Sequence, residues 1–375
     1  MSKPDFDVII IGGGPAGSIA GIYLSRNGFR TAIIERKTFP RETLCGEFLS
    51  LEVIEQIRYL DLEKKFLALE PNRIKSFRFI AGNREFRSEI PFESFALKRS
   101  VFDEFLLNEA VNSGIYLFQP TEVKEVINEG ELFIVRTNTG GEMKGISSRF
   151  LIGAFGKYNQ LDKKLQRKYS DKKTGYYGIK FHACKNELSN IDDSSVYIFV
   201  GNNIYMGINS VNREEAAICF LAKKNAKISP SDHLSQLIEE SKQLSGIFNN
   251  NIPDLRQYEV YGAGSIYFGR KELLKNGIIM IGDAAKIIAP LAGDGIGMAF
   301  QSAKTAAETI KEAVETHMNS RELERVYKAK WNNQFSRRTL AAGIVQNIIL
   351  RNSYLRIIPD ALINRIIPIL INATR

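Results

Sequence analysis

The residues with the clearest chemical meaning in this sequence are three glycines near its start. Gly12, Gly14 and Gly17 follow the apolar segment FDVIII in the spacing GxGxxG. Gly12 permits a tight turn, Gly14 lets backbone amides approach a pyrophosphate, and Gly17 lets the following helix pack closely on the strand. The pattern therefore predicts a nucleotide-binding loop with the pyrophosphate at the positive end of a helix.

The segments around this loop complete the pattern. FDVIII is a continuous run of the kind found in buried parallel strands, and a second apolar strand, TAIIE, ends at Glu35. A carboxylate at this position can accept hydrogen bonds from an adenosine ribose. Strand, glycines, helix, second strand and terminal acid together indicate a βαβ unit, and the acid favours FAD or NAD over NADP.

A second glycine cluster lies far along the chain, within residues 281–308. Gly293, Gly295 and Gly297 stand at every second position before an alanine-rich segment that is predicted to be helical, and the preceding strand ends at Asp283. Loops at the carboxyl ends of parallel strands meet in one crevice, and FAD is long enough to use both clusters. We expect Asp283 to hold ribityl hydroxyls and the amides around Gly295 to lie near the pyrimidine edge of the flavin.

These motifs also carry a resemblance to a known family. IGGGPAG, Glu35-Arg36, CGE at 45–47, LKRSVFDEFLLNEA and GDAAKIIAPLAGDGI together resemble the geranylgeranyl reductase branch of the p-hydroxybenzoate-hydroxylase-type flavoproteins, from residue 5 to about 320. The resemblance implies FAD as the cofactor. The FAD contacts that it implies are Ala16, Glu35, Arg36, Cys45, Gly46, Arg99, Val123, Asp283, Gly295 and Ile296.

Arg99 opens the predicted helix RSVFDEFLLNEAV. From this position its guanidinium can reach a phosphate or the ribityl chain of the cofactor. The alternative is an ion pair with Asp103, four residues later on the same helix face.

Cys45 and His182 are the candidates for catalysis. The resemblance places Cys45 beside the flavin, as a reactive thiol, a small spacer or a buried structural cysteine, and the sequence shows no basic neighbour to form a thiolate. His182, on the same predicted strand face as Lys180, is either an acid or base near the substrate or a structural histidine. The three histidines lack metal-like spacing, and no metal site is predicted.

The segment pattern predicts an α/β protein with a Rossmann-like FAD-binding domain, a mostly antiparallel β-sheet substrate domain and a C-terminal helical tail. The boundaries are 1–70, 98–165 and 270–318 for the discontinuous FAD-binding domain, 71–97 and 166–269 for the substrate domain, and 319–375 for the tail. Aromatic residues on the predicted substrate-domain strands either line an apolar pocket or pack in the core. They are Phe77, Phe79, Tyr177, Phe181, Tyr197, Phe199 and Tyr205.

Three departures from the relatives bear on the substrate and the reductant. Where isoprenoid reductases carry a YxWxFP-like signature, this chain reads YMGINS at 205–210. Phe155-Gly156 replaces the DG pair of single-component hydroxylases, and the WxWxIP signature of flavin halogenases is absent. A polyprenyl substrate is therefore not implied, and a separate reductase becomes a possible partner.

The predicted function is that of an FAD-dependent, NAD(P)H-linked monooxygenase that hydroxylates a hydrophobic aromatic or polyunsaturated small molecule. An ene-reductase that saturates C=C bonds is the alternative within the family. A non-enzymatic lipid or prenyl binder belongs to another class, and the intact Gly12, Glu35 and Asp283 oppose it. A dehydrogenase that uses only NAD leaves the second glycine cluster unexplained.

Charge and composition bear on partners and compartment. The formal net charge is +9, and arginines from Arg337 onward are interleaved with isoleucine and leucine. An apolar stripe at helical spacing predicts either peripheral membrane contact or packing on the enzyme. It consists of Leu355, Ile358, Leu362, Ile366 and Ile369. Three cysteines and a start without signal-peptide features predict a cytoplasmic protein. No motif indicates nucleic-acid binding.

Overall fold

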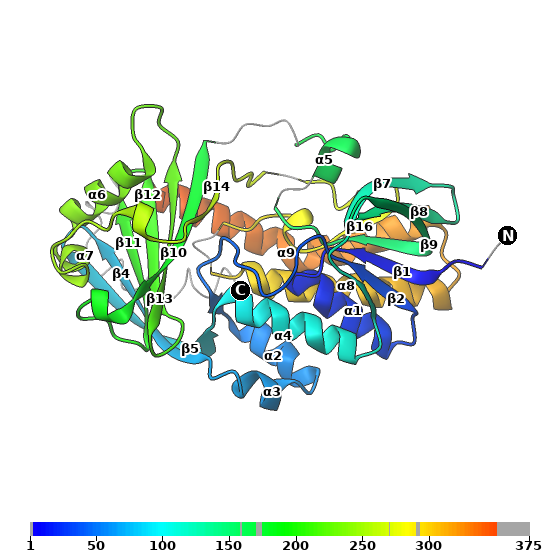
Figure 1. Cartoon of the computed structure of the whole chain (residues 1–375), viewed down its shortest axis with the longest axis horizontal. Coiled ribbons are helices and arrows are strands. Elements are labelled where there is room, and N and C mark those ends of the chain that lie inside the picture. The colour runs from blue at the N-terminus through cyan, green and yellow to red at the C-terminus, as the bar shows by residue number, and fades with distance from the viewer. Residues whose placement is uncertain (1–2, 158–159, 170–174, 270, 290–292, 351–375) are drawn as a thin grey trace.

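The computed structural model describes residues 3–157, 160–169, 175–269, 271–289 and 293–350, and its strands form two large sheets. Figure 1 shows these sheets at opposite ends of the molecule, with β1 in one and β10 to β14 in the other. The predicted α/β fold class is confirmed. The hydrophobic stripe predicted for the tail lies in 351–375, outside the described residues.

The first sheet is parallel at its centre. Its order is β15-β16-β9-β1-β2-β6, and β8 and β7 continue from β9 as antiparallel strands. β1 pairs in parallel with β2 and with β9, and its apolar residues are buried on both faces of the sheet. Both features are those of the buried parallel strand that the sequence predicts. The strands are β1 (Phe6–Ile11), β2 (Thr31–Ile34), β6 (Tyr116–Phe118), β7 (Glu122–Asn128), β8 (Phe133–Thr139), β9 (Glu142–Gly153), β15 (Leu274–Lys275) and β16 (Ile278–Met280).

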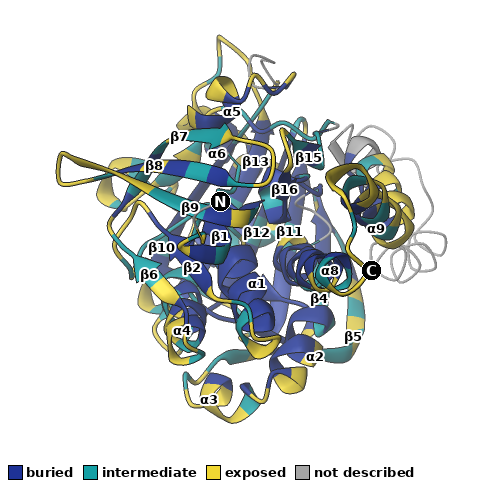
Figure 2. Ribbon diagram, turned by 90° about the vertical axis from the view of Figure 1, so that its right-hand side faces the viewer, coloured by how far each residue is buried: buried dark blue, intermediate teal, exposed yellow. Residues whose placement is uncertain are grey.

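Helices α1, α4 and α8 pack together on one face of this sheet. α1 and α8 bury alanine- and glycine-rich faces, so their backbones approach closely, and Figure 2 shows both as largely buried ribbons. The helices are α1 (Pro15–Arg26), α2 (Leu51–Tyr59), α3 (Glu63–Leu67), α4 (Arg99–Asn112), α5 (Gln160–Lys164), α6 (Pro230–Glu240), α7 (Lys242–Ile247), α8 (Gly295–Glu315) and α9 (Ser320–Leu350).

The second sheet has the order β14-β10-β13-β12-β11-β4-β5-β3. Its pairs are antiparallel, as predicted, except that β11 pairs with β4 in parallel. α6 and α7 cover one face, and the other face is turned toward the first sheet. The strands are β3 (Phe48–Leu49), β4 (Asn72–Ala81), β5 (Arg84–Ala96), β10 (Tyr176–Cys184), β11 (Ser195–Gly201), β12 (Ile204–Ser210), β13 (Glu215–Lys223) and β14 (Tyr261–Ala263).

α9 packs on the outside of the first half and reaches β11 of the second sheet. Its buried Tyr327 donates a hydrogen bond to the Met280 carbonyl of the first sheet at 2.7 Å. Further along α9, the Arg338 guanidinium binds the Glu52 carboxylate at 2.7 Å. Among the described helices, each is either too short or too polar to cross a lipid bilayer.

Candidate functional site

A cavity of about 600 Å³ lies where the two glycine clusters meet. Gly12 and Gly14 line it from the end of β1, and Asp283 and Gly295 line it from the turn after β16 and the start of α8. Both glycine clusters therefore face one space, because the parallel strands β1 and β16 both end at this edge of the sheet. The volume lies within the range of cofactor sites.

The structure places nearly all the predicted cofactor residues on the wall of this cavity. Those that line it are Gly12, Gly14, Ala16, Glu35, Arg36, Cys45, Gly46, Arg99, Val123, Asp283, Gly295 and Ile296. Gly17 lies beneath the loop, where an added Cβ would come within 1.8 Å of the Gly12 carbonyl oxygen. It is thus needed for the packing of α1 on the loop, which is the role that the spacing predicts for it.

Glu35 has the geometry of a ribose acceptor. Its Oε2 accepts a hydrogen bond from the Gly13 amide at 2.8 Å, and its Oε1 accepts one from the Lys37 amide at 2.8 Å. The side chain is buried, and both oxygens keep a lone pair for a further donor. These two hydrogen bonds therefore fix the orientation of the Glu35 carboxylate at the C-terminal end of β2.

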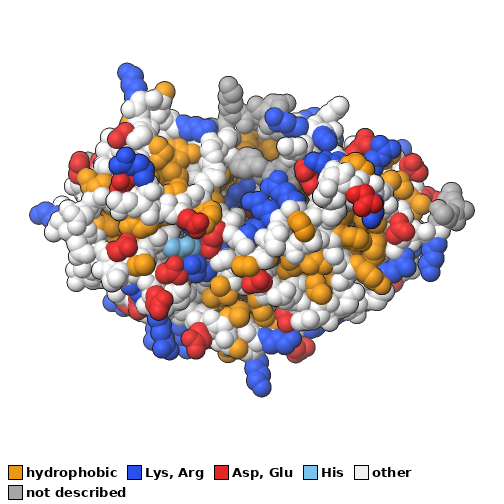
Figure 3. Space-filling view, in the orientation of Figure 1, with side chains coloured by type: hydrophobic (Ala, Val, Ile, Leu, Met, Phe, Trp, Pro, Cys, Tyr) orange, Lys and Arg blue, Asp and Glu red, His pale blue; other side chains and the backbone are white. Residues whose placement is uncertain are grey.

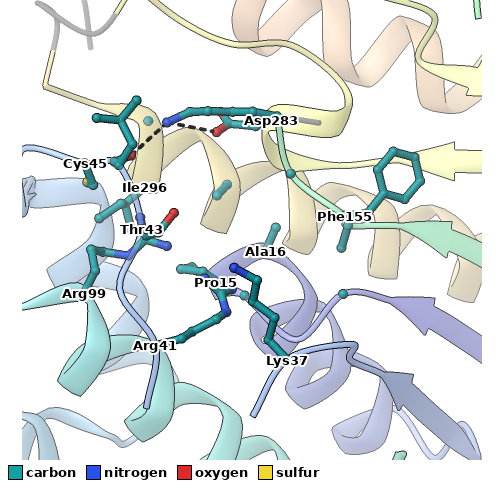
Figure 4. Close-up of a pocket in the computed structure, with 18 of the residues that line it drawn as sticks. Pro15, Ala16, Lys37, Arg41, Thr43, Cys45, Arg99, Phe155, Asp283 and Ile296 are labelled. Atoms are coloured by element: carbon teal, nitrogen blue, oxygen red, sulfur yellow. Dashed lines mark hydrogen bonds and ion pairs between the residues drawn. The ribbon is translucent and has the colours of Figure 1, made fainter. Parts of the chain in front are cut away.

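Two arginines and a buried aspartate form the cationic end of the cavity. Arg99 makes a bidentate ion pair with the fully buried Asp103, at 2.6 and 2.8 Å, and Arg41 Nη2 lies 3.7 Å from the same carboxylate. Figure 4 shows both arginine side chains projecting toward Pro15 and Ala16 from neighbouring elements. The sequence left open whether Arg99 pairs with Asp103 or faces the cofactor. In the structure Arg99 pairs with Asp103 and also lines the cavity.

Arg41 is a residue that the sequence reasoning missed. Its Nη2 lies 3.4 Å from the position of a Cβ at Gly14, and its Nε is buried without a hydrogen-bond partner among the described residues. A free guanidinium donor beside a glycine loop is suited to a phosphate oxygen. The basic run ERKTFPRE, directly after the second strand, was the available signal.

Cys45 has a basic neighbour after all, which corrects the expectation from the sequence. The Arg99 guanidinium lies close to the Cys45 thiol in the cavity wall, although the two residues lie far apart in the chain. The thiol also accepts a hydrogen bond from the Glu47 amide at 3.3 Å. Figure 4 shows Cys45 in the cavity wall near Ile296 and Thr43.

His182 lies outside the cavity, in a charged cluster that ties β10 to the loop 41–47. Its Nε2 donates to Glu47 Oε2 at 2.7 Å, and the fully buried Lys180 ammonium binds both Glu47 and Glu42, the latter at 2.6 Å. Although burial disfavours the charged amine, the two carboxylates raise the pKa of Lys180 above its usual value. The contacts match the structural reading of His182, and Lys180 lies on the same face as predicted.

This cluster also has the spacing of a metal site. Ligand atoms of Glu42, Glu47 and His182 lie within 4.8 Å of one another. The ammonium of Lys180 already occupies the position between the two carboxylates, so it supplies the positive charge that a metal ion would otherwise bring.

Lys271 lies behind Asp283 and makes the cavity wall sensitive to pH. Its ammonium donates to the Asp283 carbonyl at 2.6 Å, and burial lowers its pKa to about 8, against the opposing effect of the Asp283 and Asp162 carboxylates. In the unfolded chain the same amine titrates near 10.5. Between these two values the unfolded chain binds more protons, so the stability contributed by this residue rises with pH.

We therefore expect Lys271→Met to flatten the pH dependence of stability. The native protein should gain up to about 3 kcal/mol from this residue between pH 8 and pH 10.5. Urea unfolding at several pH values measures the difference between variant and native protein. If both show the same slope over this window, the amine is not titrating in the fold.

The residues of the cavity fit FAD as a group. The cavity wall offers three features in the order that FAD requires. They are a glycine loop with exposed backbone amides, a carboxylate acceptor at the ribose position and guanidinium donors at the phosphate position. Figure 3 shows Lys and Arg side chains gathered near the centre of the face between the two halves. On the side of the second sheet the cavity wall includes the apolar side chains of Leu44, Phe48 and Ile287.

Comparison with known proteins agrees with this geometry. The sequence profile of the family described as FAD binding domain matches residues 5–335. A 1H-pyrrole-2-carbonyl-[peptidyl-carrier protein] chlorinase of Pseudomonas fluorescens is 25% identical over 84% of this chain and 78% of its own. Digeranylgeranylglycerophospholipid reductase 1 of Methanococcoides burtonii is 24% identical over 94% of this chain and 84% of its own.

Solved structures share the fold. A triple mutant of the flavin-dependent brominase Bmp2 superposes with a TM-score of 0.80 at 22% identity and covers 96% of this chain and 93% of its own. A geranylgeranyl bacteriochlorophyll reductase-like protein of Thermoplasma acidophilum gives 0.77 at 19% identity, over 98% and 91%. The resemblance to the geranylgeranyl reductase branch is thus supported, and the chain belongs to the FAD binding domain family as an FAD-dependent oxidoreductase.

Proposed function

We propose that this enzyme hydroxylates a hydrophobic substrate held between the flavin end of the cavity and the second sheet. The observation that carries the proposal is the apolar part of the cavity wall next to the second sheet. Leu44, Phe48 and Ile287 line it, and the same residues pack against strands of the second sheet. A hydrophobic compound bound there is removed from water and lies next to the cofactor site.

Bound FAD supplies two-electron redox chemistry and, once reduced, reactivity toward oxygen. The chain would position the cofactor through residues that line the cavity: Glu35 would receive the ribose, Arg41 the phosphates and Asp283 the ribityl chain. The amides at the start of α8, from Gly295, lie at the positive end of the helix and favour negative charge in their vicinity. The loop 41–47 and the apolar residues beside it line the cavity and would limit the access of water to the reacting atoms.

NAD(P)H is the proposed source of electrons, since this donor is consistent with the family. Phe155-Gly156 stands where single-component hydroxylases carry their DG pair, and Phe155 lines the cavity. This difference favours delivery of electrons by a separate reductase. Peripheral membrane contact and a cytoplasmic location stay predictions from the sequence.

Saturation of C=C bonds is the second candidate. It is favoured by the relatives named as digeranylgeranylglycerophospholipid reductases, which align with most of this chain. The chain departs from that activity at YMGINS, 205–210, where a glycine and an asparagine stand in place of the tryptophan and the phenylalanine of the expected signature.

Oxygen dependence separates the two candidates. The purified protein should be yellow, and its flavin should be reduced by NADH, NADPH or a separate flavin reductase. With a hydrophobic phenol such as 2-naphthol, we expect substrate-stimulated oxygen uptake and a product that is heavier by one oxygen atom. Unchanged conversion to a saturated product under strict anaerobiosis would instead establish the reductase.

A further inference from the structure

The face of the second sheet that is turned toward the cofactor has an uncovered row at its centre. Cys219 of β13, Gly207 of β12 and Ile198 of β11 lie directly opposite one another in register. All three are partly exposed, although they stand in the middle of an eight-stranded sheet. On the opposite face, Met206 and Ile208, the chain neighbours of Gly207, are fully buried under α6 and α7.

Residues of the cofactor cavity cover the sheet on both sides of this row. Leu44 and Ile287 pack with Tyr205 on one side. Phe48 packs with Val196 and Ala217 on the other. Ile198 contacts both groups, so the uncovered row lies between side chains that also line the cavity.

Gly207 leaves the row open. A Cβ built at this position meets only two backbone oxygens, each at 3.9 Å, among the described residues. Side chains on neighbouring strands of one face lie about 5 Å apart, so a missing side chain leaves a slot as wide as a flat ring. The surrounding sheet desolvates the partly exposed Cys219 thiol and raises its pKa to about 12, so this neighbour of the slot is uncharged.

Asn209 provides a polar group beside the slot. It lies two residues from Gly207 on the same strand and therefore on the same face, opposite Ala217, which packs with Phe48 in an apolar cluster. The side chain is 2% exposed, and its Nδ2 has no hydrogen-bond partner in the described parts of the chain. A buried donor without a partner is costly, so it points to an acceptor that a ligand brings.

We propose that Gly207 and Asn209 form a recess for a flat ring that carries a hydroxyl or carbonyl oxygen. The ring lies on the bare backbone of Gly207 between Cys219 and Ile198, and the Asn209 amide donates to the oxygen. This assignment rests on the proposed function and names the substrate class for it. A polyprenyl chain offers no acceptor to Asn209, so the recess favours a phenol or cyclic ketone over an isoprenoid.

The test compares 2-naphthol with naphthalene, which has the same rings without the oxygen. Binding of each is followed by the change in the visible flavin spectrum of the holoenzyme. In the native protein 2-naphthol should bind about tenfold more tightly than naphthalene. Gly207→Leu should weaken both at least tenfold, Gly207→Ala should have a smaller effect, and Asn209→Leu should abolish the preference for 2-naphthol.

Controls separate binding from folding. Gly246→Leu adds the same side chain to α7, on the far side of the sheet where Gly246 has no neighbour within 4 Å among the described residues, and should bind like the native protein. Asn209→Leu should keep its FAD and unfold at an unchanged or higher temperature, whereas loss of a structural residue would lower it.

Three results would overturn the recess. They are native affinity in Gly207→Leu, an undiminished preference for 2-naphthol in Asn209→Leu, and the absence of any spectral change with 2-naphthol in the native protein. Failure of the proposed function looks different: ring binding follows the expected pattern, but neither oxygen uptake nor product formation accompanies flavin reduction.

Discussion

Gly17→Ala is expected to yield a colourless protein whose free energy of unfolding is lower by about 3 kcal/mol. The added Cβ would lie 1.8 Å from the Gly12 carbonyl oxygen. That oxygen belongs to the backbone, and Gly12 is itself fixed at φ 111° beneath the Ala154 carbonyl. Neither the Gly12 backbone nor the start of α1 can therefore move without a large cost in free energy. The start of α1 must move away from β1, and the amides that receive the pyrophosphate move with it.

The ratio of flavin absorbance to protein absorbance measures the first effect, and urea unfolding measures the second. Gly295→Ala is the matched control for the stability measurement, because a Cβ there meets no atom within 4 Å among the described residues. It should leave stability unchanged or slightly higher, since alanine favours the helix, and yet weaken FAD binding by projecting into the cavity. Native FAD content in Gly17→Ala would show that the loop is not the pyrophosphate site.

The glycine positions could be predicted because their cause is local. A strand that turns directly into a helix around a phosphate leaves little room for side chains at fixed spacings, and the spacing is visible in the sequence. The second cluster could be joined to the first because parallel strands end at one edge of a sheet. These two arguments placed Gly14 and Asp283 on one cavity, although Asp283 lies far along the chain from Gly14.

The charged contacts could not be predicted in the same way. Glu47 lies 133 residues from Lys180 and 135 from His182, and no period in the sequence links them. The Arg99 guanidinium beside Cys45 was missed for the same reason. The parallel pairing of β11 with β4 was also not foreseen, because their connection passes through part of the first sheet, whereas neighbouring strands in the sequence usually form hairpins.

Lys180→Met is expected to lower the free energy of unfolding by about 3 to 5 kcal/mol at neutral pH. The ammonium is fully buried and binds both Glu42 and Glu47. Without it, two carboxylates face each other in a site that, among the described residues, keeps His182, Ser100 and the Arg99 amide as partners. Because these carboxylates belong to the loop 41–47, FAD should also dissociate faster.

The pH dependence and a second variant distinguish this ionic effect from lost packing. Burial acts to raise the pKa of Glu42, but its hydrogen bonds from Lys180 and Ser100 outweigh burial and hold the pKa below the ordinary value of 4.5. The stability that Glu42 gains from Lys180 is therefore present above pH 4.5 and is lost as the pH falls through the lower folded value. The stability deficit of Lys180→Met should therefore shrink in acid.

The double variant Lys180→Met/Glu47→Gln should recover part of the loss at neutral pH, because it removes one of the uncompensated charges. Lys185→Met, which breaks a partly exposed pair with Asp193 just beyond the same strand, should cost no more than about 1 kcal/mol. A deficit that is independent of pH and that the double variant deepens would mean that Lys180 acts through packing, and the charge on the loop would then play no part in holding the cofactor.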